Sequence, residues 1–372
     1  MIEFPHEMLR EIYEQPEALE RTLDLYLQGN TLRPDVASRL AAWPSPTEEI
    51  LVAASGSSRH SGLYGEILLE DLCGLAVDVE YASEYSYRGE NKSRKPSLLV
   101  ISQSGETSDT LAALEAGKRQ GCRTLAITNA ANSTMANAAD LSMPLAAGPE
   151  KAIPATKSFT CQLAVLYLLG LYEGARLKRI DDLALSAHIA ELRALPEKIA
   201  ASLDRWRDQA AALAQKYSAA ATFLYLGRGI HYAIAREGAL KLKESSYIHA
   251  EGYPTGELRH GPNALVSDRV PLVVLATVDR THAPSVARYQ KTIQLLGGMK
   301  EQHARVICIA CSGDRNISNI SDRIDIPAAS EYLLPILEVV PLQLFAYCMA
   351  VERKVDVDRP RNLSKAVVEP TH

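Results

Sequence analysis

The stretch Leu98-Leu-Val-Ile-Ser-Gln-Ser-Gly-Glu-Thr107 contains the pattern that decides the fold. Residues 98–102 form a short apolar run typical of a buried strand, and a glycine with further hydroxyl side chains follows at once. A helical pattern begins after Thr107. A strand, a turn and a helix in this order are the repeating unit of an α/β fold with a parallel sheet.

The same unit recurs along the chain of 372 residues. Short apolar runs occupy residues 50–54, 98–102 and 124–128 in the first half, and residues 222–226, 272–276 and 305–310 in the second half. The second set repeats the order of the first at an offset of roughly 170 to 180 residues, which predicts a duplicated domain. Each half is therefore expected to be a parallel β-sheet flanked by helices, an αβα sandwich.

The segments around these runs have helical spacing of apolar residues. Residues 162–217 and 232–251 are predicted to be helical, as are residues 7–27, where Pro16 separates two helices. The predicted organisation is N-terminal helices in 1–45, a first domain in 46–190, connecting helices in 191–215, a second domain in 216–355 and a C-terminal tail in 356–372.

Composition and charge argue against several classes of protein. The formal charge is −5 and Lys and Arg do not cluster, which argues against a nucleic-acid surface. Residues 1–10 lack the apolar run of a signal peptide, and no stretch reaches the roughly 18 apolar residues of a membrane span. We therefore expect a cytoplasmic protein without nucleic-acid or membrane partners. Cys308 and Cys311 are expected to lie in a buried strand rather than to form half of a zinc site.

Two turns at predicted strand ends carry hydroxyl side chains, Ser55-Gly-Ser-Ser58 and Ser102-Gln-Ser-Gly-Glu-Thr107. Open α/β sheets bind ligands at the carboxyl ends of their strands, where helix N-termini present free N–H groups to a phosphate. Ser102, Ser104 and Thr107 are placed for this. The alternative is that these residues are only helix caps and turn formers. Two such loops in one domain favour a ligand site, and the absence of GxGxxG and GxxxxGK[ST] argues against dinucleotides and NTPs.

Four further side chains suit proton transfer on a sugar. Lys241 and Glu244 lie three residues apart on one face of a predicted helix, and His260 lies in a loop bounded by Gly and Pro. A carboxylate can move a proton between adjacent carbons, a histidine can open a pyranose ring, and Lys365 in the tail can form a Schiff base. The residues alone do not exclude non-catalytic alternatives. Lys241 and Glu244 could form a surface ion pair, His260 could have no special role, and Lys365 could be a solvated charge.

Six ordered motifs resemble the isomerase half of glutamine:fructose-6-phosphate amidotransferase, the glucosamine-6-phosphate synthase family, almost end to end. They are Glu11-Ile-Tyr-Glu-Gln-Pro16, Ser102-Gln-Ser-Gly-Glu-Thr107, Ala155-Thr-Lys-Ser-Phe-Thr160, Lys241-Leu-Lys-Glu244 with Tyr247-Ile-His-Ala-Glu251, Gly256-Glu-Leu-Arg-His-Gly-Pro262, and Asp358-Arg-Pro-Arg-Asn-Leu-Ser-Lys365. The resemblance implies two tandem SIS (sugar isomerase) domains that act on a hexose 6-phosphate. From the proposed chemistry we expect neither a cofactor nor a metal.

The resemblance also implies roles for single residues. Glu244 would move the proton between C1 and C2 with Lys241 nearby. His260 would open the ring from the neighbouring subunit of a homodimer, and Lys365 would form an imine with the open-chain ketose. The residues expected at the phosphate and the sugar are Ser57, Ser58, Ser102, Gln103, Ser104, Thr107, Ile153, Ala155 and Ser364.

Two differences from the family pattern bear on the reaction. Residue 2 is Ile2, whereas the family's glutaminase domain has an N-terminal Cys nucleophile, so we expect no ammonia derived from glutamine. Ala155 stands where the family has a Ser. The sequence favours a stand-alone glucosamine-6-phosphate deaminase. The alternatives are a fructosamine-6-phosphate deglycase, an aldose–ketose isomerase, a synthase half that uses ammonia or works with a detached glutaminase, and a non-catalytic phosphosugar sensor.

Overall fold

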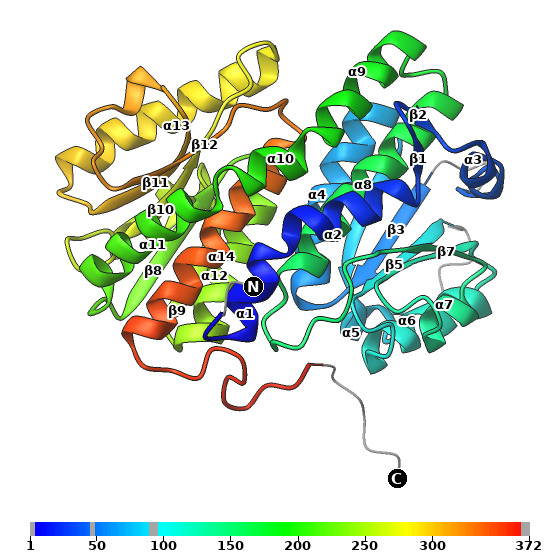
Figure 1. Cartoon of the computed structure of the whole chain (residues 1–372), viewed down its shortest axis with the longest axis horizontal. Helices are drawn as coiled ribbons and strands as arrows, with labels where there is room; N and C mark the ends of the chain where they lie inside the picture. Colours follow the sequence, from blue (N-terminus) through cyan, green and yellow to red (C-terminus); the bar gives the residue numbers. More distant parts are fainter. Residues whose placement is uncertain (1–3, 45–48, 89–95, 366–372) are drawn as a thin grey trace. The chain divides into compact units, whose positions relative to one another are not determined.

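The computed structural model describes residues 4–44, 49–88 and 96–365 and contains two compact units (Figure 1). The N-sheet unit comprises Glu17–Glu150, Lys157–Ala194 and the tail from Ser364. The C-sheet unit comprises the first 16 residues, Lys151–Thr156 and Leu195–Leu363. Each unit contains one five-stranded parallel sheet, so the predicted α/β class and its duplication are confirmed.

The sheet of the N-sheet unit has the strand order β4-β3-β5-β6-β7. Its strands are β3 (Glu49–Ala54), β4 (Ala76–Tyr81), β5 (Ser97–Ser102), β6 (Thr124–Thr128) and β7 (Leu141–Pro144). Its helices are most of α2 (Gln15–Asp24), α3 (Pro34–Leu40), α4 (Gly56–Cys73), α5 (Ala82–Tyr85), α6 (Ser108–Arg119), α7 (Thr134–Ala138), α8 (Lys157–Arg176) and α9 (Asp182–Arg193). A short hairpin, β1 (Leu27–Gln28) and β2 (Thr31–Leu32), lies outside this sheet.

Helices cover both faces of this sheet, which explains why its central strands are continuously apolar. All six residues of β5 are buried. On one face Leu98 belongs to the same core cluster as Leu114 of α6. On the other face a Cβ added at Gly62 of α4 would lie 3.0 Å from Val52 of β3. The small residues of α4 therefore let it pack closely on the sheet.

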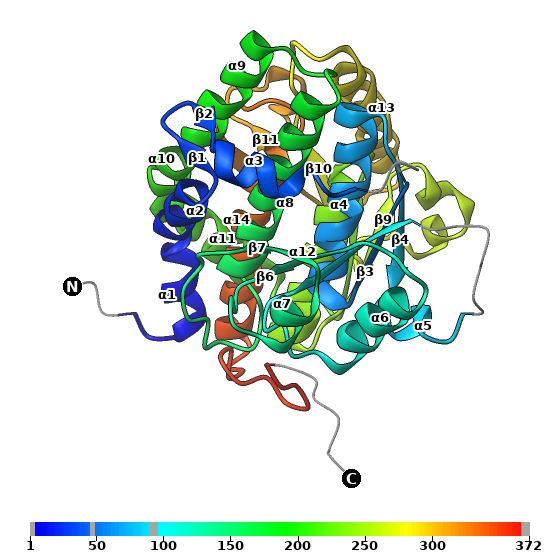
Figure 2. The same ribbon diagram turned by 90° about the vertical axis from the view of Figure 1, so that its right-hand side faces the viewer.

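The C-sheet unit repeats the topology in the order β9-β8-β10-β11-β12. Its strands are β8 (Thr222–Gly227), β9 (His249–Pro254), β10 (Leu272–Ala276), β11 (Val306–Cys311) and β12 (Arg323–Ile326). Its helices are α1 (Glu7–Tyr13), α10 (Leu195–Ala200), α11 (Leu203–Tyr217), α12 (His231–Ser246), α13 (Ala283–Glu301) and α14 (Leu334–Glu352), with 3₁₀ turns η1 (Glu257–His260), η2 (Pro262–Leu265) and η3 (Arg315–Ile317). Figure 2 shows the same elements from the side.

Alternate residues of β8 point to opposite faces of this sheet. Leu224 belongs to a core cluster with Leu295 of α13. Phe223 instead packs edge-on against Phe345 of α14, with ring centroids 5.9 Å apart. The predicted buried strand around Cys308 and Cys311 is confirmed, because both side chains are buried in β11.

Helix α14 corrects one expectation from the sequence. By length and composition it could cross a membrane, contrary to the expectation that no stretch reaches that length. Its most apolar window is 94% buried inside the protein, as in the core helix of a folded domain.

The structure also corrects the predicted elements at the sheet edges. Each of the two large sheets has five strands where three were predicted, because β4, β7, β9 and β12 are short or interrupted by polar residues. The helix predicted for residues 232–251 begins at His231 and ends at Ser246. Tyr247 follows in a left-handed conformation with φ of 58°, and Glu251 lies in β9.

Candidate functional site

A hollow of about 230 Å³ lies at the carboxyl ends of β3 and β5, entirely within the N-sheet unit. This is the edge at which parallel α/β sheets bind ligands. It contains eight of the thirteen residues that the sequence predicted for the site. Its lining consists of Ser55, Gly56, Ser57, Ser58, Ile101, Ser102, Gln103, Ser104, Thr107, Thr110, Ser364 and Lys365.

The loop between β5 and α6 is held by its own hydroxyl groups. Ser102 Oγ accepts a hydrogen bond from the N–H of Gly105 (3.1 Å) and lies 3.1 Å from Thr107 Oγ1. Ser104 Oγ accepts from the N–H of Glu106 at 3.2 Å. Ser102 and Ser104 therefore both stabilise the turn through their side chains. Thr107 precedes α6 without a side-chain capping bond, so capping does not account for its hydroxyl.

Gly105 is required at the bend of this loop. Its φ is +67°, a conformation that side chains rarely adopt. A Cβ at this position would lie 2.5 Å from Cβ of Ser133 and 2.9 Å from Oγ1 of Thr128. The glycine thus lets the loop pack against the end of β6.

The loop between β3 and α4 forms the opposite wall. Gly56 has φ of +54°, and no atom lies within 4 Å of the place a Cβ would take. Ser58 is 8% exposed, and its Oγ accepts a hydrogen bond from Nε2 of Gln162 at 3.0 Å. The first turns of α4 and α6 both begin at this hollow, so their free N–H groups and positive dipole ends favour an anion.

The tail contributes a cation to the hollow. Lys365 is the one positively charged side chain among the described residues that line it. Its Nζ donates to Oε2 of Glu150 at 2.7 Å, and Oγ of Ser158 donates to the same oxygen at 2.7 Å. The N–H of Ser158 donates to Oε1 of Glu150 at 3.1 Å. Glu150 is 7% exposed, so a buried, multiply bonded carboxylate holds the lysine.

Sequence reasoning missed Glu150 and Thr110. Glu150 lies between the strand β7 and the helix α8, far along the chain from Lys365, and a single carboxylate after Gly148 and Pro149 has no recognisable pattern. Thr110 could have been inferred, because it lies in the first turn of α6 beside the predicted phosphate loop.

The C-sheet unit contains the predicted proton-transfer residues of α12. Lys241 is only 1% exposed, and its Nζ lies 2.5 Å from Oε2 of Glu244 and 3.4 Å from Oε1 of Glu237. The alternative of a solvated surface pair is therefore wrong, because this lysine is buried between two carboxylates. Burying a lysine requires such partners, whose charges compensate its lost hydration.

His260, Ile153 and Ala155 also belong to the C-sheet unit. His260 is exposed at the end of η1, which buried Leu258 anchors. Gly261 follows with φ of +139° and ends the turn. The N–H of Ile153 donates to the carbonyl of Asp358 at 3.0 Å.

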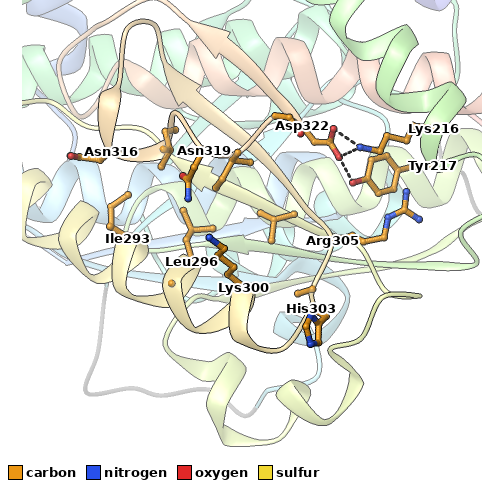
Figure 3. A pocket seen from close by; sticks show the side chains of 16 residues that line it. Lys216, Tyr217, Ile293, Leu296, Lys300, His303, Arg305, Asn316, Asn319 and Asp322 are labelled. Atoms are coloured by element: carbon orange, nitrogen blue, oxygen red, sulfur yellow. Dashed lines mark hydrogen bonds and ion pairs between the residues drawn. The ribbon is translucent and has the colours of Figure 1, made fainter.

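The C-sheet unit has a larger hollow, of about 520 Å³, at the amino ends of its strands (Figure 3). Its lining includes the first residue of β11, Val306, and Asp322 just before β12. Asp322 accepts hydrogen bonds from Lys216 and Tyr217. None of the predicted site residues lines it, and it lies at the amino ends of these strands, away from the usual ligand edge.

Comparisons with known proteins agree with the predicted family. The model of the SIS domain matches residues 45–172 and 216–353. The glutamine–fructose-6-phosphate aminotransferase [isomerizing] of Thermus thermophilus is 42% identical over 368 residues, covering 98% of this chain and 59% of the relative. That of Chlorobaculum tepidum is 40% identical over 371 residues, covering 98% and 58%. This chain thus spans less than two thirds of the length of these relatives.

Two solved structures are similar over nearly the whole chain. The C-terminal domain of glucosamine-fructose-6-phosphate aminotransferase from Francisella tularensis has a TM-score of 0.88 and 31% identity, covering 96% of this chain and 99% of that one. Glucosamine-6-phosphate deaminase from Thermotoga maritima has a TM-score of 0.72 at 22% identity, covering 98% and 100%, which shows a shared fold. With both repeats matched, this chain belongs to the SIS domain family and is related to the C-terminal domain of these aminotransferases.

Proposed function

We propose that this chain binds a hexose 6-phosphate and converts glucosamine 6-phosphate to fructose 6-phosphate and ammonia. One observation carries the proposal: the hydroxyl-lined loops after β3 and β5 and the amine of Lys365 line a single hollow. A phosphate needs the donors of the loops, and an open-chain keto sugar needs an amine within reach to form an imine.

The phosphate is proposed to bind in the loop between β5 and α6. Loop N–H groups and the hydroxyl of Thr107 would donate to its oxygens, and the helix N-terminus would stabilise its negative charge. Ser57 and Ser58 in the other wall would contact the sugar hydroxyls. Ile153, Ala155 and Ser364 are proposed as further sugar contacts.

The proposed reaction begins with ring opening by His260, which moves the proton of the C1 hydroxyl to the ring oxygen. Glu244 then takes the proton from C2 and delivers it to C1, and one proton of the C2 amine passes to the C1 oxygen. The C1 aldehyde thereby becomes a hydroxymethyl group, and the amine at C2 becomes an imine. Water attacks this imine, and ammonia leaves. Because the C1 aldehyde accepts the electrons released when the C2 proton leaves, the scheme needs no metal.

Lys365 and Lys241 have supporting roles in the proposal. Lys365 can attack the C2 imine and expel ammonia, giving a lysine imine that water hydrolyses to the ketone. Lys241 would orient Glu244, since the two groups are ion-paired at 2.5 Å. We further propose a cytoplasmic homodimer in which His260 comes from the neighbouring subunit.

The names of the relatives support the choice of sugar. The aminotransferases named above act on fructose 6-phosphate and glutamine, and the Thermotoga maritima protein is named a deaminase of glucosamine 6-phosphate. Both names describe the addition or removal of an amino group on a hexose 6-phosphate. The reaction proposed here uses the same carbon atoms and needs only water as the second substrate.

The test is to incubate the purified chain with glucosamine 6-phosphate and to measure ammonia and fructose 6-phosphate. Equal amounts of both, formed much more slowly by Lys365→Ala and at the wild-type rate by the control Lys354→Ala, would support the proposal. Lys354 is a suitable control because it is exposed in the turn that follows α14. No ammonia above background would reject the deaminase. Fructosamine 6-phosphate, glucose 6-phosphate, and fructose 6-phosphate with ammonium, offered in parallel, would then identify a deglycase, an isomerase or a synthase half.

A further inference from the structure

The second sheet has its own counterpart of the strand-end hollow, and side chains fill it. By strand order β8 and β10 correspond to β3 and β5. The loop after β8 has Gly229 with φ of +59°, as the loop after β3 has Gly56 with φ of +54°. His231 begins α12 there, and α13 brings Ser285 and Arg288 to the end of β10. The duplicated fold therefore brings polar donors to the same edge in both repeats.

These donors converge on one carboxylate, that of Glu331. Oε1 accepts from Nε of Arg288 (2.8 Å) and lies 3.2 Å from Nε2 of His231. Oε2 accepts from Nη2 of Arg288 (3.0 Å) and from Oγ of Ser285 (2.5 Å). Glu331 is 7% exposed. Two cationic groups and a hydroxyl therefore surround both oxygens, as donors surround a bound anion.

A second buried carboxylate, Glu338 of α14, completes the cluster. Its oxygens lie 2.7 and 2.8 Å from Nδ1 of His231, and Thr277 donates a hydrogen bond to it. Burial and the charge of Arg288 oppose protonation of His231, but Glu338 and Glu331 outweigh them and raise the pKa of His231. Two cations then balance two carboxylates. The one donor left over is Nη1 of Arg288, which is buried without a hydrogen-bond partner in the described residues.

We propose that the strand-end edge of the second sheet is an anion site that the carboxylate of Glu331 occupies in place of a ligand. Glu331 lies between the last strand, β12, and the following helix, α14, as Glu150 lies between β7 and α8. Glu150 binds Lys365 and leaves a hollow, whereas Glu331 takes the donors itself. The duplicated chain then has one site for an external anion in its first repeat and an internally filled one in its second.

The test removes the carboxylate of Glu331 by mutation and supplies acetate in solution as a replacement. Glu331→Gly should melt about 10 °C below the wild type in sodium chloride, because His231 and Arg288 lose their shared partner. Replacing chloride by sodium acetate at constant ionic strength and pH 7 should restore at least half of this loss. The wild type should show no comparable gain, because Glu331 already fills its site.

Glu173→Ala is the matched control, since Glu173 is a fully buried carboxylate with an arginine partner on its own helix. Acetate should not restore its stability. An equal acetate gain in both variants, or an unchanged melting temperature in Glu331→Gly, would overturn the proposal. If Glu331→Gly gives no soluble protein, Glu331→Gln is the deciding variant, because its amide fills the space without a charge. Glu331→Gln should melt at a lower temperature than the wild type, and acetate should not raise its melting temperature. Wild-type stability in Glu331→Gln would also refute the internal anion.

Discussion

Oε2 of Glu150 accepts hydrogen bonds from both Nζ of Lys365 and Oγ of Ser158, each at 2.7 Å. The lysine belongs to the C-terminal tail, and the glutamate lies 215 residues earlier in the chain. Because the side chain of Glu150 is buried and that of Lys365 is 27% exposed, the carboxylate is the fixed member of the pair. It determines where the amine lies at the wall of the hollow.

We expect Glu150→Gln to lower the turnover of the proposed reaction by about 100-fold with little change in KM. The amide keeps the shape of the side chain but loses the charge that orients Lys365 and can accept its proton. Steady-state kinetics with glucosamine 6-phosphate would measure this. Ser158→Ala is the control, because it removes one bond to Glu150 and leaves the charge. A change in KM alone would contradict a positioning role for Glu150.

Substitution of Gly105 and of Gly121 would distinguish the cost of backbone strain from the cost of a steric clash. Both have positive φ, but a Cβ at Gly105 would overlap Ser133, whereas no atom lies within 4 Å of a Cβ at Gly121. Gly121→Ala should cost about 1 kcal/mol of unfolding free energy, and Gly105→Ala about 3 kcal/mol with loss of phosphate binding. Urea unfolding and phosphate titration would test this. Equal losses in the two variants would show that the loop accommodates the methyl group.

The ion pair of Lys241 and Glu244 leads to a prediction about catalysis. Glu244→Gln should reduce turnover by at least about 100-fold, since the amide cannot accept the C2 proton, and should leave sugar-phosphate affinity nearly unchanged. Calorimetric binding and an ammonia assay on the same preparation would separate the two effects. Glu301→Gln, at an exposed position of α13, is the control. Normal turnover in Glu244→Gln would rule out this residue as the base.

Glu173 should make stability depend on pH. Burial outweighs the ion pair with Arg176 and raises the pKa of Glu173 to about 7, from a usual value of 4.5. Between these values the folded chain binds more protons than the unfolded chain, so the unfolding free energy should fall as pH rises from about 4.5 through 7. The loss contributed by this group is about 3 kcal/mol.

Comparing Glu173→Gln with the wild type at pH 5 and pH 8 by urea unfolding would measure this dependence. The variant should show a smaller loss at pH 8, because its amide does not ionise. Glu17→Gln, an exposed change on α2, should behave like the wild type. If the unfolding free energy of Glu173→Gln fell as much between pH 5 and pH 8 as that of the wild type, the carboxyl would not be titrating in this range.

Local patterns in the sequence were sufficient to predict the central strands and the hydroxyl-rich loops after β3 and β5. Residues 98–102 predicted β5 because a strand covered on both faces must be apolar throughout, and the hydroxyl run after it marked the loop. The edge strands β4 and β12 were not predicted, since their alternating or charged residues resemble loops. The end of α12 was missed because Tyr247 takes a left-handed conformation that usually belongs to glycine or asparagine.

The sequence by itself determined the α/β class, the duplication and the hydroxyl-rich loops that follow β3 and β5, because these depend on short-range periodicity and on motifs of adjacent residues. Only the tertiary structure decided which charges meet. Glu150 reaches Lys365, and Glu331 fills the edge of the second sheet, through contacts between segments far apart in the chain. Such pairings depend on how strands and helices pack, and no local spacing in the sequence encodes them.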